Sequence, residues 1–319
     1  MPLIDMPLEK LKTYDGTNPC PSNFDAYWDR GLAEMAGTRD NIELTEAAFQ
    51  TPNARCQDLY FTGVKGARVH AKLLTPKNAS GRRPAVLFFH GYTGSAGDWS
   101  NYLGYVGAGF VVAALDCRGQ GGMSEDTGAV KGNTHHGHII RGLDGDPDQL
   151  LFRQIFLDTA QLARIVMGLD SVDPDRVGAT GGSQGGGLTL ACTSLVPGIK
   201  RSAPRIPFLS DYQRVWEMDL AKGAYAELKE YFRHFDPTHA NETGVFTRLG
   251  YIDVHNLAPR IQANTLMLTG LVDEICPPST QFAAYNRIRG EKSMVIYPDF
   301  GHENLPGGDD LVFSHLLEL

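Results

Sequence analysis

The chain has 319 residues, 42% of them hydrophobic and 21% charged, which is typical of a globular protein with a full core and excludes a disordered chain. Lys and Arg number 29 and Asp and Glu number 37, so the formal net charge is −8. An acidic balance of this kind argues against nucleic acid or an anionic membrane surface as a partner.

The sequence shows no targeting or membrane signal. No run of about 18 apolar residues occurs, and residues 1–15 lack a basic segment followed by an apolar one. The five cysteines are widely spaced and include no CxxC pair, so neither a zinc ribbon nor a disulfide framework is indicated. We therefore expect a cytoplasmic protein with reduced thiols and no membrane contact.

The first predicted elements in chain order are a helix and a pair of strands. After an irregular start, apolar residues recur every three or four positions, which predicts one face of a helix: Phe24, Trp28, Leu32 and Met35. Rough alternation of apolar and polar residues over 59–64 and 69–73 then predicts two paired strands.

From Pro84 onward, short apolar runs alternate with helical patterns. The runs have strand length and are apolar on both faces, as in a parallel sheet covered by helices: 85–89, 110–115, 177–180, 265–268 and 293–297. Candidate helices lie between and after them: 150–169, 187–195, 282–288 and 311–317. This alternation predicts an α/β fold with a mostly parallel central sheet. We expect residues 1–319 to form a single domain.

One long segment, about residues 210–250, does not follow the alternation. Within it, Tyr225, Leu228 and Phe232 lie at helical spacing and predict at least one amphipathic helix. We interpret the segment as a helical insertion between two strands. Its role could be to cover the core or to cap a pocket or subunit contact, and the pattern favours neither.

The segment Gly181-Gly182-Ser183-Gln184-Gly185 matches the G-x-S-x-G motif. The match is weak by itself, but an apolar strand precedes it and a helix of small residues follows. Strand, sharp turn and helix make a nucleophile elbow, in which glycine neighbours leave room around a serine with strained backbone. The alternative is a glycine-rich packing turn in which Ser183 only caps the helix.

A serine hydroxyl needs a base, and the base needs a partner that orients it. Asp273 follows the run 265–268 and His302 follows the run 293–297, so both lie beyond strand ends, where ligands bind in open α/β sheets. The chain order Ser183, Asp273, His302 is that of α/β-hydrolases. Each residue also has a structural alternative: Asp273 as a helix cap, His302 as a hydrogen-bonded loop residue. Glu274 is the rival acid.

Two backbone N–H groups are the expected donors of an oxyanion hole. One belongs to Gln184, the residue after the candidate nucleophile, and the other to Tyr92, in the loop after the run 85–89. Tyr92 could instead be a packed aromatic residue at a turn.

Together these motifs resemble carbohydrate esterase family 7, which contains the acetyl xylan esterases and cephalosporin-C deacetylases. The resemblance spans the chain from its N-terminal region to the last helix and rests on these segments: His90-Gly91-Tyr92, Arg118-Gly119-Gln120-Gly121-Gly122, the segment around Ser183, Leu271-Val272-Asp273 and His302-Glu303. The loop 127–149 matches least well.

The resemblance implies an α/β-hydrolase fold that removes acetyl groups from sugars and from cephalosporin C through an acyl-serine intermediate. It also implies a homo-hexamer built as a dimer of trimers. No metal or organic cofactor is required by this chemistry. We expect Arg118, Gln120 and Glu303 to support the site, with Arg118 tying loops together and Glu303 orienting the loop of His302.

Three other classes are less well supported by the residues. The segment Thr134–His138 holds three close histidines, but no acidic ligand or helical spacing indicates a formed zinc site. A non-catalytic binding protein on this fold would usually have lost part of the Ser–His–Asp set. A peptidase of this fold usually carries an additional gating domain, for which the chain has no room. The sequence therefore predicts a serine esterase whose partner is a small acetylated carbohydrate or a cephalosporin.

Overall fold

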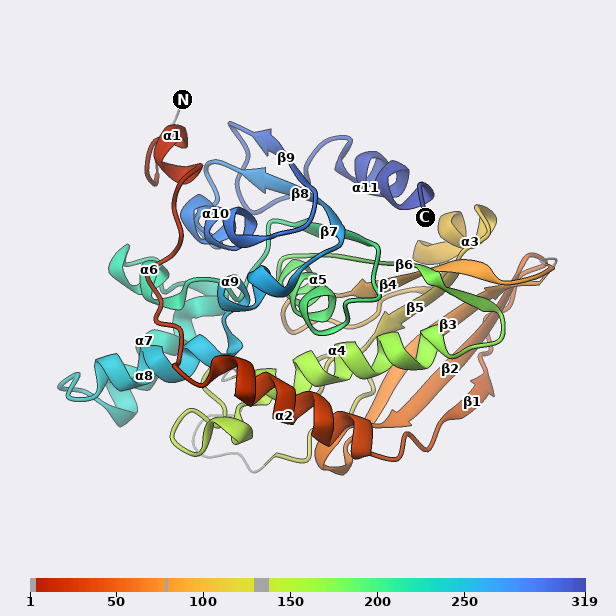
Figure 1. Cartoon of the computed structure of the whole chain (residues 1–319), viewed down its shortest axis with the longest axis horizontal. Coiled ribbons are helices and arrows are strands. Elements are labelled where there is room, and N and C mark those ends of the chain that lie inside the picture. The colour runs from red at the N-terminus through yellow and green to blue at the C-terminus, as the bar shows by residue number, and fades with distance from the viewer. Residues whose placement is uncertain (1–3, 78–79, 129–137) are drawn as a thin grey trace.

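Nine strands form one sheet within residues 4–77, 80–128 and 138–319, the part of the chain that the computed structural model describes (Figure 1). The strands are β1 (Glu43–Glu46), β2 (Ala54–Thr62), β3 (Arg68–Pro76), β4 (Arg83–Phe89), β5 (Val111–Leu115), β6 (Val172–Gly182), β7 (Arg201–Arg205), β8 (Asn264–Gly270) and β9 (Lys292–Tyr297). Their order across the sheet is β1-β2-β3-β5-β4-β6-β7-β8-β9.

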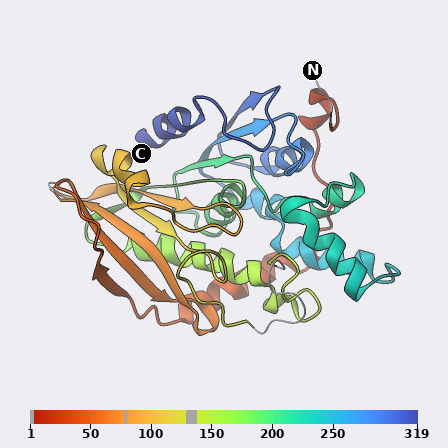
Figure 2. The same ribbon diagram turned by 180° about the vertical axis from the view of Figure 1, so that it is seen from behind.

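Most of the sheet is parallel. The neighbours from β5 through β4, β6, β7 and β8 to β9 run in one direction, while β1, β2 and β3 are antiparallel to one another and β3 is antiparallel to β5. Seen from behind, the antiparallel strands lie at one side of the molecule and helices α6 (Tyr212–Glu217), α7 (Ala226–Phe235) and α8 (Glu242–Leu249) at the other (Figure 2).

The central strands are apolar on both faces because both faces are covered. In β5, Val111, Ala113 and Leu115 join one core cluster, while Val112 and Ala114 join the cluster on the opposite face. Helices α2 (Phe24–Gly37), α4 (Leu151–Met167), α5 (Gln184–Leu195), α9 (Val254–Leu257) and α10 (Pro278–Arg287) contribute to the first cluster, and α3 (Leu103–Gly107) and α11 (Gly308–Leu317) to the second. A short helix, α1 (Leu8–Leu11), precedes them. This arrangement confirms the predicted α/β-hydrolase fold.

Some predicted boundaries are wrong. The patterns missed β1 and β7 entirely, because β1 is an exposed edge strand and β7 begins and ends with arginine. Val64 lies in a 3₁₀ turn that joins β2 to β3, not in a strand. Helices α5, α10 and α11 each begin three or four residues before the predicted start, since glycine and proline occupy their first turns.

The helical insertion follows β7 and lies beyond the carboxyl ends of the parallel strands (Figures 1 and 2). Tyr225, Leu228 and Phe232 are buried in the larger core cluster. The Tyr225 ring lies 4.4 Å, centroid to centroid, from the ring of Phe208, in the loop that follows β7. The insertion therefore extends the core and also covers the edge of the sheet where the candidate site lies.

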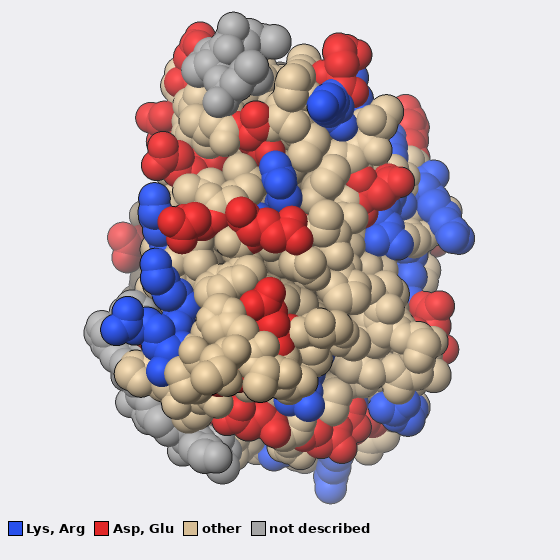
Figure 3. All heavy atoms as spheres, turned by 90° about the vertical axis from the view of Figure 1, so that its left-hand side faces the viewer, with Lys and Arg blue, Asp and Glu red and all other residues tan. Residues whose placement is uncertain are grey.

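On the face that the insertion occupies, the described residues show charged side chains of both signs (Figure 3). Lys and Arg are interspersed there with Asp and Glu, around a broad area of uncharged residues (Figure 3). None of the helices within the described residues combines the length and the apolar character needed to cross a membrane.

Candidate active site

Ser183 forms the sharp turn between β6 and α5. Its backbone has φ +56° and ψ −119°, in a region that a residue with a side chain rarely adopts. The turn is held by hydrogen bonds from Ser183 N–H to the Arg205 carbonyl and from Phe208 N–H to the Ser183 carbonyl, both 3.0 Å long. A Cβ atom at Gly185 would lie 2.0 Å from the Phe89 carbonyl oxygen, so only glycine allows α5 to start this close to β4. Strand, strained serine and helix are the predicted elbow geometry.

The structure brings together the three side chains that the sequence places in one chemical unit. The Ser183 Oγ lies 2.9 Å from His302 Nε2, and His302 Nδ1 lies 2.9 Å from Asp273 Oδ2. The Asp273 side chain is buried, whereas the His302 side chain is 21% exposed. When Nδ1–H donates to Asp273, Nε2 is left as the acceptor of the serine proton. This line of hydrogen bonds can activate a hydroxyl for attack on a carbonyl carbon.

Asp273 is held in place by donors other than His302. Its Oδ1 accepts from the N–H groups of Ile275 and Cys276 at 2.9 and 2.7 Å, and its Oδ2 accepts from Gln281 Nε2 at 3.2 Å. Asp273 therefore caps a turn and orients the imidazole at the same time, so the two interpretations of this residue are compatible. Glu274, the rival acid, is exposed and makes no contact with His302 that the structure records.

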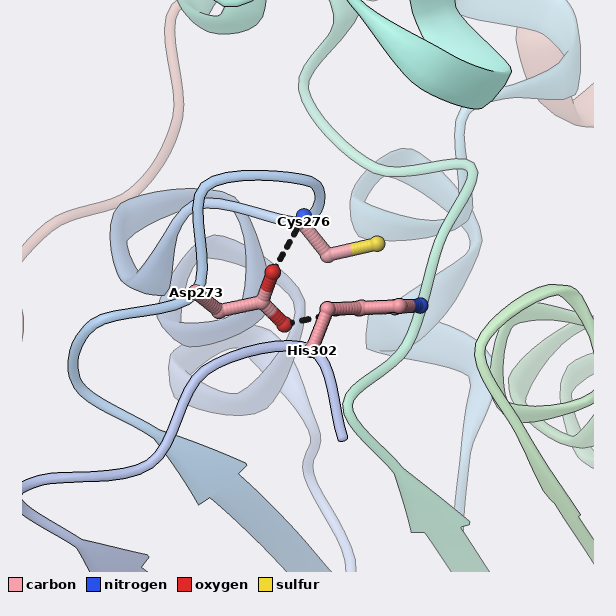
Figure 4. A group of neighbouring side chains, drawn as sticks. All are labelled: Asp273, Cys276 and His302. Carbon is pink, nitrogen blue, oxygen red and sulfur yellow. Dashed lines mark hydrogen bonds and ion pairs between the residues drawn. The ribbon is translucent and has the colours of Figure 1, made fainter. Parts of the chain in front are cut away.

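Cys276 adds a thiol to this group (Figure 4). One ligand atom from each of Asp273, Cys276 and His302 lies within 4.8 Å of the others, and these residue types can bind zinc. However, hydrogen bonds already occupy both oxygens of Asp273 and both ring nitrogens of His302. Burial, together with the Asp273 carboxylate, raises the pKa of the Cys276 thiol well above its usual value, which keeps it protonated. The geometry thus fits a hydrogen-bonded catalytic group better than a metal site.

The predicted oxyanion donors lie on either side of the elbow. Gln184 is the first residue of α5 and is fully buried. Tyr92 follows β4, where its ring packs edge-on against His138 and Phe208 at centroid distances of 5.2 and 5.4 Å. The Tyr92 ring is therefore packed, and its loop lies beside the serine turn, where Gln184 Nε2 donates to the His90 carbonyl at 3.4 Å. The role of its N–H group remains a prediction.

Gln120 connects the loop after β5 to the start of α5. Its Nε2 donates to Gln184 Oε1 at 2.7 Å, and Gln184 Nε2 donates back to Gln120 Oε1 at 3.0 Å. The neighbouring Gly121 N–H donates to the Gly94 carbonyl at 2.9 Å. These bonds fix the loops of both predicted oxyanion donors relative to one another.

Arg118 and Glu303, the other two residues expected to support the site, both make hydrogen bonds within the protein. The Arg118 guanidinium binds Asp158 of α4 through two hydrogen bonds of 2.5 and 2.6 Å, and both side chains are buried. Such a paired, buried guanidinium is typical of a structural role rather than substrate contact. Glu303 Oε1 accepts from the Gly301 N–H at 3.0 Å and so shapes the loop that carries His302.

Of the histidine segment, residues 134–137 lie outside the described residues. His138 is buried, and the metal hypothesis for this segment gains no support from the part that the structure describes.

The sequence patterns missed a buried polar network that involves the loops after β4 and β5. The carboxylate of Asp116 accepts from Ala96 N–H at 2.7 Å, from Met123 N–H at 2.9 Å and from His70 Nδ1 at 2.7 Å. His70 Nε2 in turn lies 2.9 Å from Asp58. The only signal in the sequence was that Asp116 comes directly after an apolar strand, two residues before Arg118. Asp116 therefore joins the loop after β4 to the loop after β5.

The Asp116 network is expected to make the fold sensitive to acid. Burial alone would raise the pKa of Asp116, but the hydrogen bonds from His70, Met123 and Ala96 outweigh it and lower that pKa from 3.8 to about 2. Because the pKa is lower in the folded state, this group stabilises the fold above about pH 4 and loses that contribution as the pH falls to about 2. The contribution is roughly 2 kcal/mol. Denaturant unfolding should give wild type a larger free energy of unfolding than Asp116→Asn at pH 5, and this difference should shrink as the pH falls to 2. A difference that stays constant over this pH range would contradict the assignment.

Several known proteins are similar to this chain in sequence and structure. The chain matches the family model described as acetyl xylan esterase (AXE1) over residues 1–318. It is similar to the crystal structure of acetyl xylan esterase 1 from Thermoanaerobacterium sp. JW/SL YS485, with 58% identity, a TM-score of 0.97 and coverage of 98% of this chain and 99% of that one. It is also similar to an acetyl xylan esterase from Paenibacillus sp. R4, with 34% identity, a TM-score of 0.92 and the same coverage.

Two other proteins are less similar to this chain in sequence. Acetyl esterase Axe7A of Xylanibacter ruminicola (strain ATCC 19189 / DSM 19721 / CIP 105475 / JCM 8958 / 23) is 27% identical over 297 residues, and the match covers 91% of this chain. It covers 64% of Axe7A, so this chain spans less than two thirds of that protein. A prolyl endopeptidase structure at 18% identity and a TM-score of 0.60 shares the fold alone.

Proposed function

Because this chain belongs to the acetyl xylan esterase family, a family of carboxylic ester hydrolases, we propose that it is a serine esterase that removes acetyl groups from acetylated sugars such as xylo-oligosaccharides. The observation that carries the proposal is the line of hydrogen bonds from Ser183 Oγ through His302 to Asp273. We extend the proposal to cephalosporin C, which presents the same kind of ester, an acetyl group on a small alcohol.

In the first half of the reaction, Ser183 Oγ attacks the acetyl carbonyl carbon while His302 Nε2 takes its proton. The carbonyl oxygen becomes negative and is stabilised by the N–H groups of Gln184 and Tyr92. The C–O bond to the sugar then breaks, and His302 returns the proton to the departing alcohol oxygen. Asp273 keeps the imidazole in the required tautomer and stabilises its positive charge. The product is an acetyl-serine and a free alcohol.

In the second half, water takes the place of the alcohol. His302 removes a proton from this water as it attacks the acetyl-serine carbonyl, and the same two N–H groups stabilise the second oxyanion. Collapse of the intermediate breaks the bond to Ser183, which recovers its proton from His302, and acetate leaves. Each proton passes through one imidazole that contacts both the serine and the buried carboxylate, and no other acid or base is needed.

The activity on an ester is expected to fall as its acyl chain becomes longer. Beside the serine turn, the Phe208 ring packs against the rings of both Tyr92 and Tyr225, and we propose that these three rings limit the length of the acyl group. We expect kcat/KM for an acetyl ester to exceed that for the octanoyl ester of the same alcohol by at least about tenfold, since the added methylene groups must fit beside these rings. Equal rates would instead indicate a general esterase or lipase.

A substrate panel tests the proposed class directly. The panel comprises acetylated xylo-oligosaccharides, cephalosporin C and the amide that matches one of the esters, with Ser183→Ala as the blank. The proposal requires ester hydrolysis that the blank lacks, and little or no amide hydrolysis. Preferred cleavage of the amide would favour the peptidase alternative.

We also propose that residues 1–319 act as one domain within a homo-hexamer. Support for one domain comes from Asp5, near the start of the chain, whose carboxylate binds Arg214 of α6 and the Ser279 N–H of α10, both at 2.8 Å. Exposed apolar residues on and beside the edge strand β1 are compatible with self-association: Ile42, Leu44 and Phe49.

A further inference from the structure

A pocket of about 190 Å³ opens beside the candidate base, on the side of β7 and α11. His302 lines it together with Gly182, the residue before the serine, and with three polar side chains, Arg205, Glu303 and Asn304. Three buried residues complete its wall: Ile206, Leu305 and Gly308. The function proposed above does not yet assign a role to this pocket.

Arg205 has hydrogen-bonding capacity that the protein does not use. Its Nη1 pairs with Asp309, but no residue of the described segments accepts from its Nε, and none is recorded for its Nη2. These two nitrogens form one edge of the planar guanidinium. A Cβ atom at Gly182 would lie 3.9 Å from Nε and 4.0 Å from Nη2, so this edge lies next to the elbow. The side chain is 29% exposed, but its Nε is buried, so Nη2 is the unused donor that a molecule in the pocket can reach.

The other polar residues supply complementary groups. Glu303 is exposed and uses one carboxylate oxygen for the Gly301 N–H, while its second oxygen has no recorded partner in the described residues. Asn304 is exposed, and no hydrogen bond of its side chain is recorded there. The pocket therefore offers donors from Arg205 and Asn304 and acceptors from Glu303 and Asn304.

The reaction determines which part of the substrate lies here. His302 Nε2 must reach the departing oxygen to protonate it, so the alcohol part of the ester lies on the His302 side of Ser183. A sugar has neighbouring hydroxyl groups that both donate and accept, and its C–H faces suit an apolar wall. A substrate carboxylate would meet Arg205 but would be repelled by Glu303. The mixed polarity of the pocket thus fits a polyol better than an anion.

We propose that Arg205, Glu303 and Asn304 form a leaving-group subsite that binds hydroxyl groups of the acetylated sugar. Arg205 is the main donor, through its unused Nη2. This inference rests on the proposed esterase function and adds to it the residues that select a sugar over a leaving group that has no further hydroxyl groups.

The test compares two acetyl esters in the full-length protein. One is an acetylated xylo-oligosaccharide and the other is phenyl acetate, whose leaving group has no further hydroxyls. The readout is the ratio of kcat/KM for the sugar ester to kcat/KM for phenyl acetate. Arg205→Lys keeps the charge beside Asp309 but removes Nη2, and we expect it to lower the ratio about tenfold, mainly through KM, as expected for a lost hydrogen bond to a charged donor.

Two further variants make the result decisive. Arg201→Lys is the matched control, because Arg201 begins the same strand, pairs with Glu318 and lies outside the pocket; its ratio should equal that of wild type. Asn304→Ala changes an exposed residue and should lower the ratio without lowering the thermal unfolding temperature. Wild-type ratios in both Arg205→Lys and Asn304→Ala would overturn the subsite. If wild type cleaves phenyl acetate but no sugar acetate, the proposed substrate class is wrong and the subsite is wrong with it.

Discussion

Replacing Ser183 by alanine is expected to lower kcat for hydrolysis of an acetyl ester by about 10⁶, close to the uncatalysed background. The reason is that the hydroxyl lost is the one that bonds His302 Nε2 at 2.9 Å, so neither an acyl-serine nor its proton transfer can form. The measurement is initial-rate kinetics on phenyl acetate and on an acetylated xylo-oligosaccharide.

Ser194→Ala is the matched control for this variant. Ser194 is also a buried serine in α5, but its hydroxyl only donates to the Leu190 carbonyl, so activity should stay within about twofold of wild type. Far-ultraviolet circular dichroism should show that both variants are folded. Activity of Ser183→Ala within tenfold of wild type would refute the assignment of the nucleophile.

Asp273→Asn is expected to lower kcat by about 10⁴ while the protein remains folded. An asparagine in this place can still accept the Ile275 and Cys276 N–H bonds through its oxygen. Its amide group would then face His302 Nδ1 as a donor, which favours the tautomer with the proton on Nε2. An imidazole in that tautomer cannot accept the proton of Ser183.

Glu274→Gln separates the two acidic candidates. Glu274 is exposed and adjacent in sequence, so its loss should change kcat by no more than about twofold. A loss in Glu274→Gln that equals the loss in Asp273→Asn would contradict the assignment of the acid.

The strands that carry the candidate site could be predicted because parallel strands are apolar on both faces. The apolar runs that correspond to β6, β8 and β9 end three to five residues before Ser183, Asp273 and His302, and the carboxyl ends of these strands share one edge of the sheet. Order along the chain and position after a strand end were therefore sufficient to expect that three residues distant in sequence would meet.

β7 could not be predicted in the same way. Its sequence, Arg-Ser-Ala-Pro-Arg, has no apolar run, although its three central residues are buried. The strand is stabilised by ladders to β6 and β8 rather than by its own composition. Because β7 was missed, the position of Arg205 at the edge of the candidate site was missed too.

Long-range polar groups were the other class that sequence patterns could not show. His70 and Asp116 are 46 positions apart, and Arg118 and Asp158 are 40 apart, with no fixed spacing that would mark either pair. His70 and Asp116 meet only because β3 lies antiparallel beside β5, and Arg118 and Asp158 meet only because α4 packs on the sheet. The contact between the insertion and Phe208 likewise depends on a loop whose path the sequence pattern does not specify.

The most direct test of the central claim is covalent labelling with a fluorophosphonate, which reacts with an activated serine. We expect one phosphonyl group per chain, mapped by mass spectrometry to Ser183, with activity lost in proportion to labelling and no labelling in His302→Ala. Complete labelling with activity retained, or labelling at a different residue as activity falls, would contradict the account.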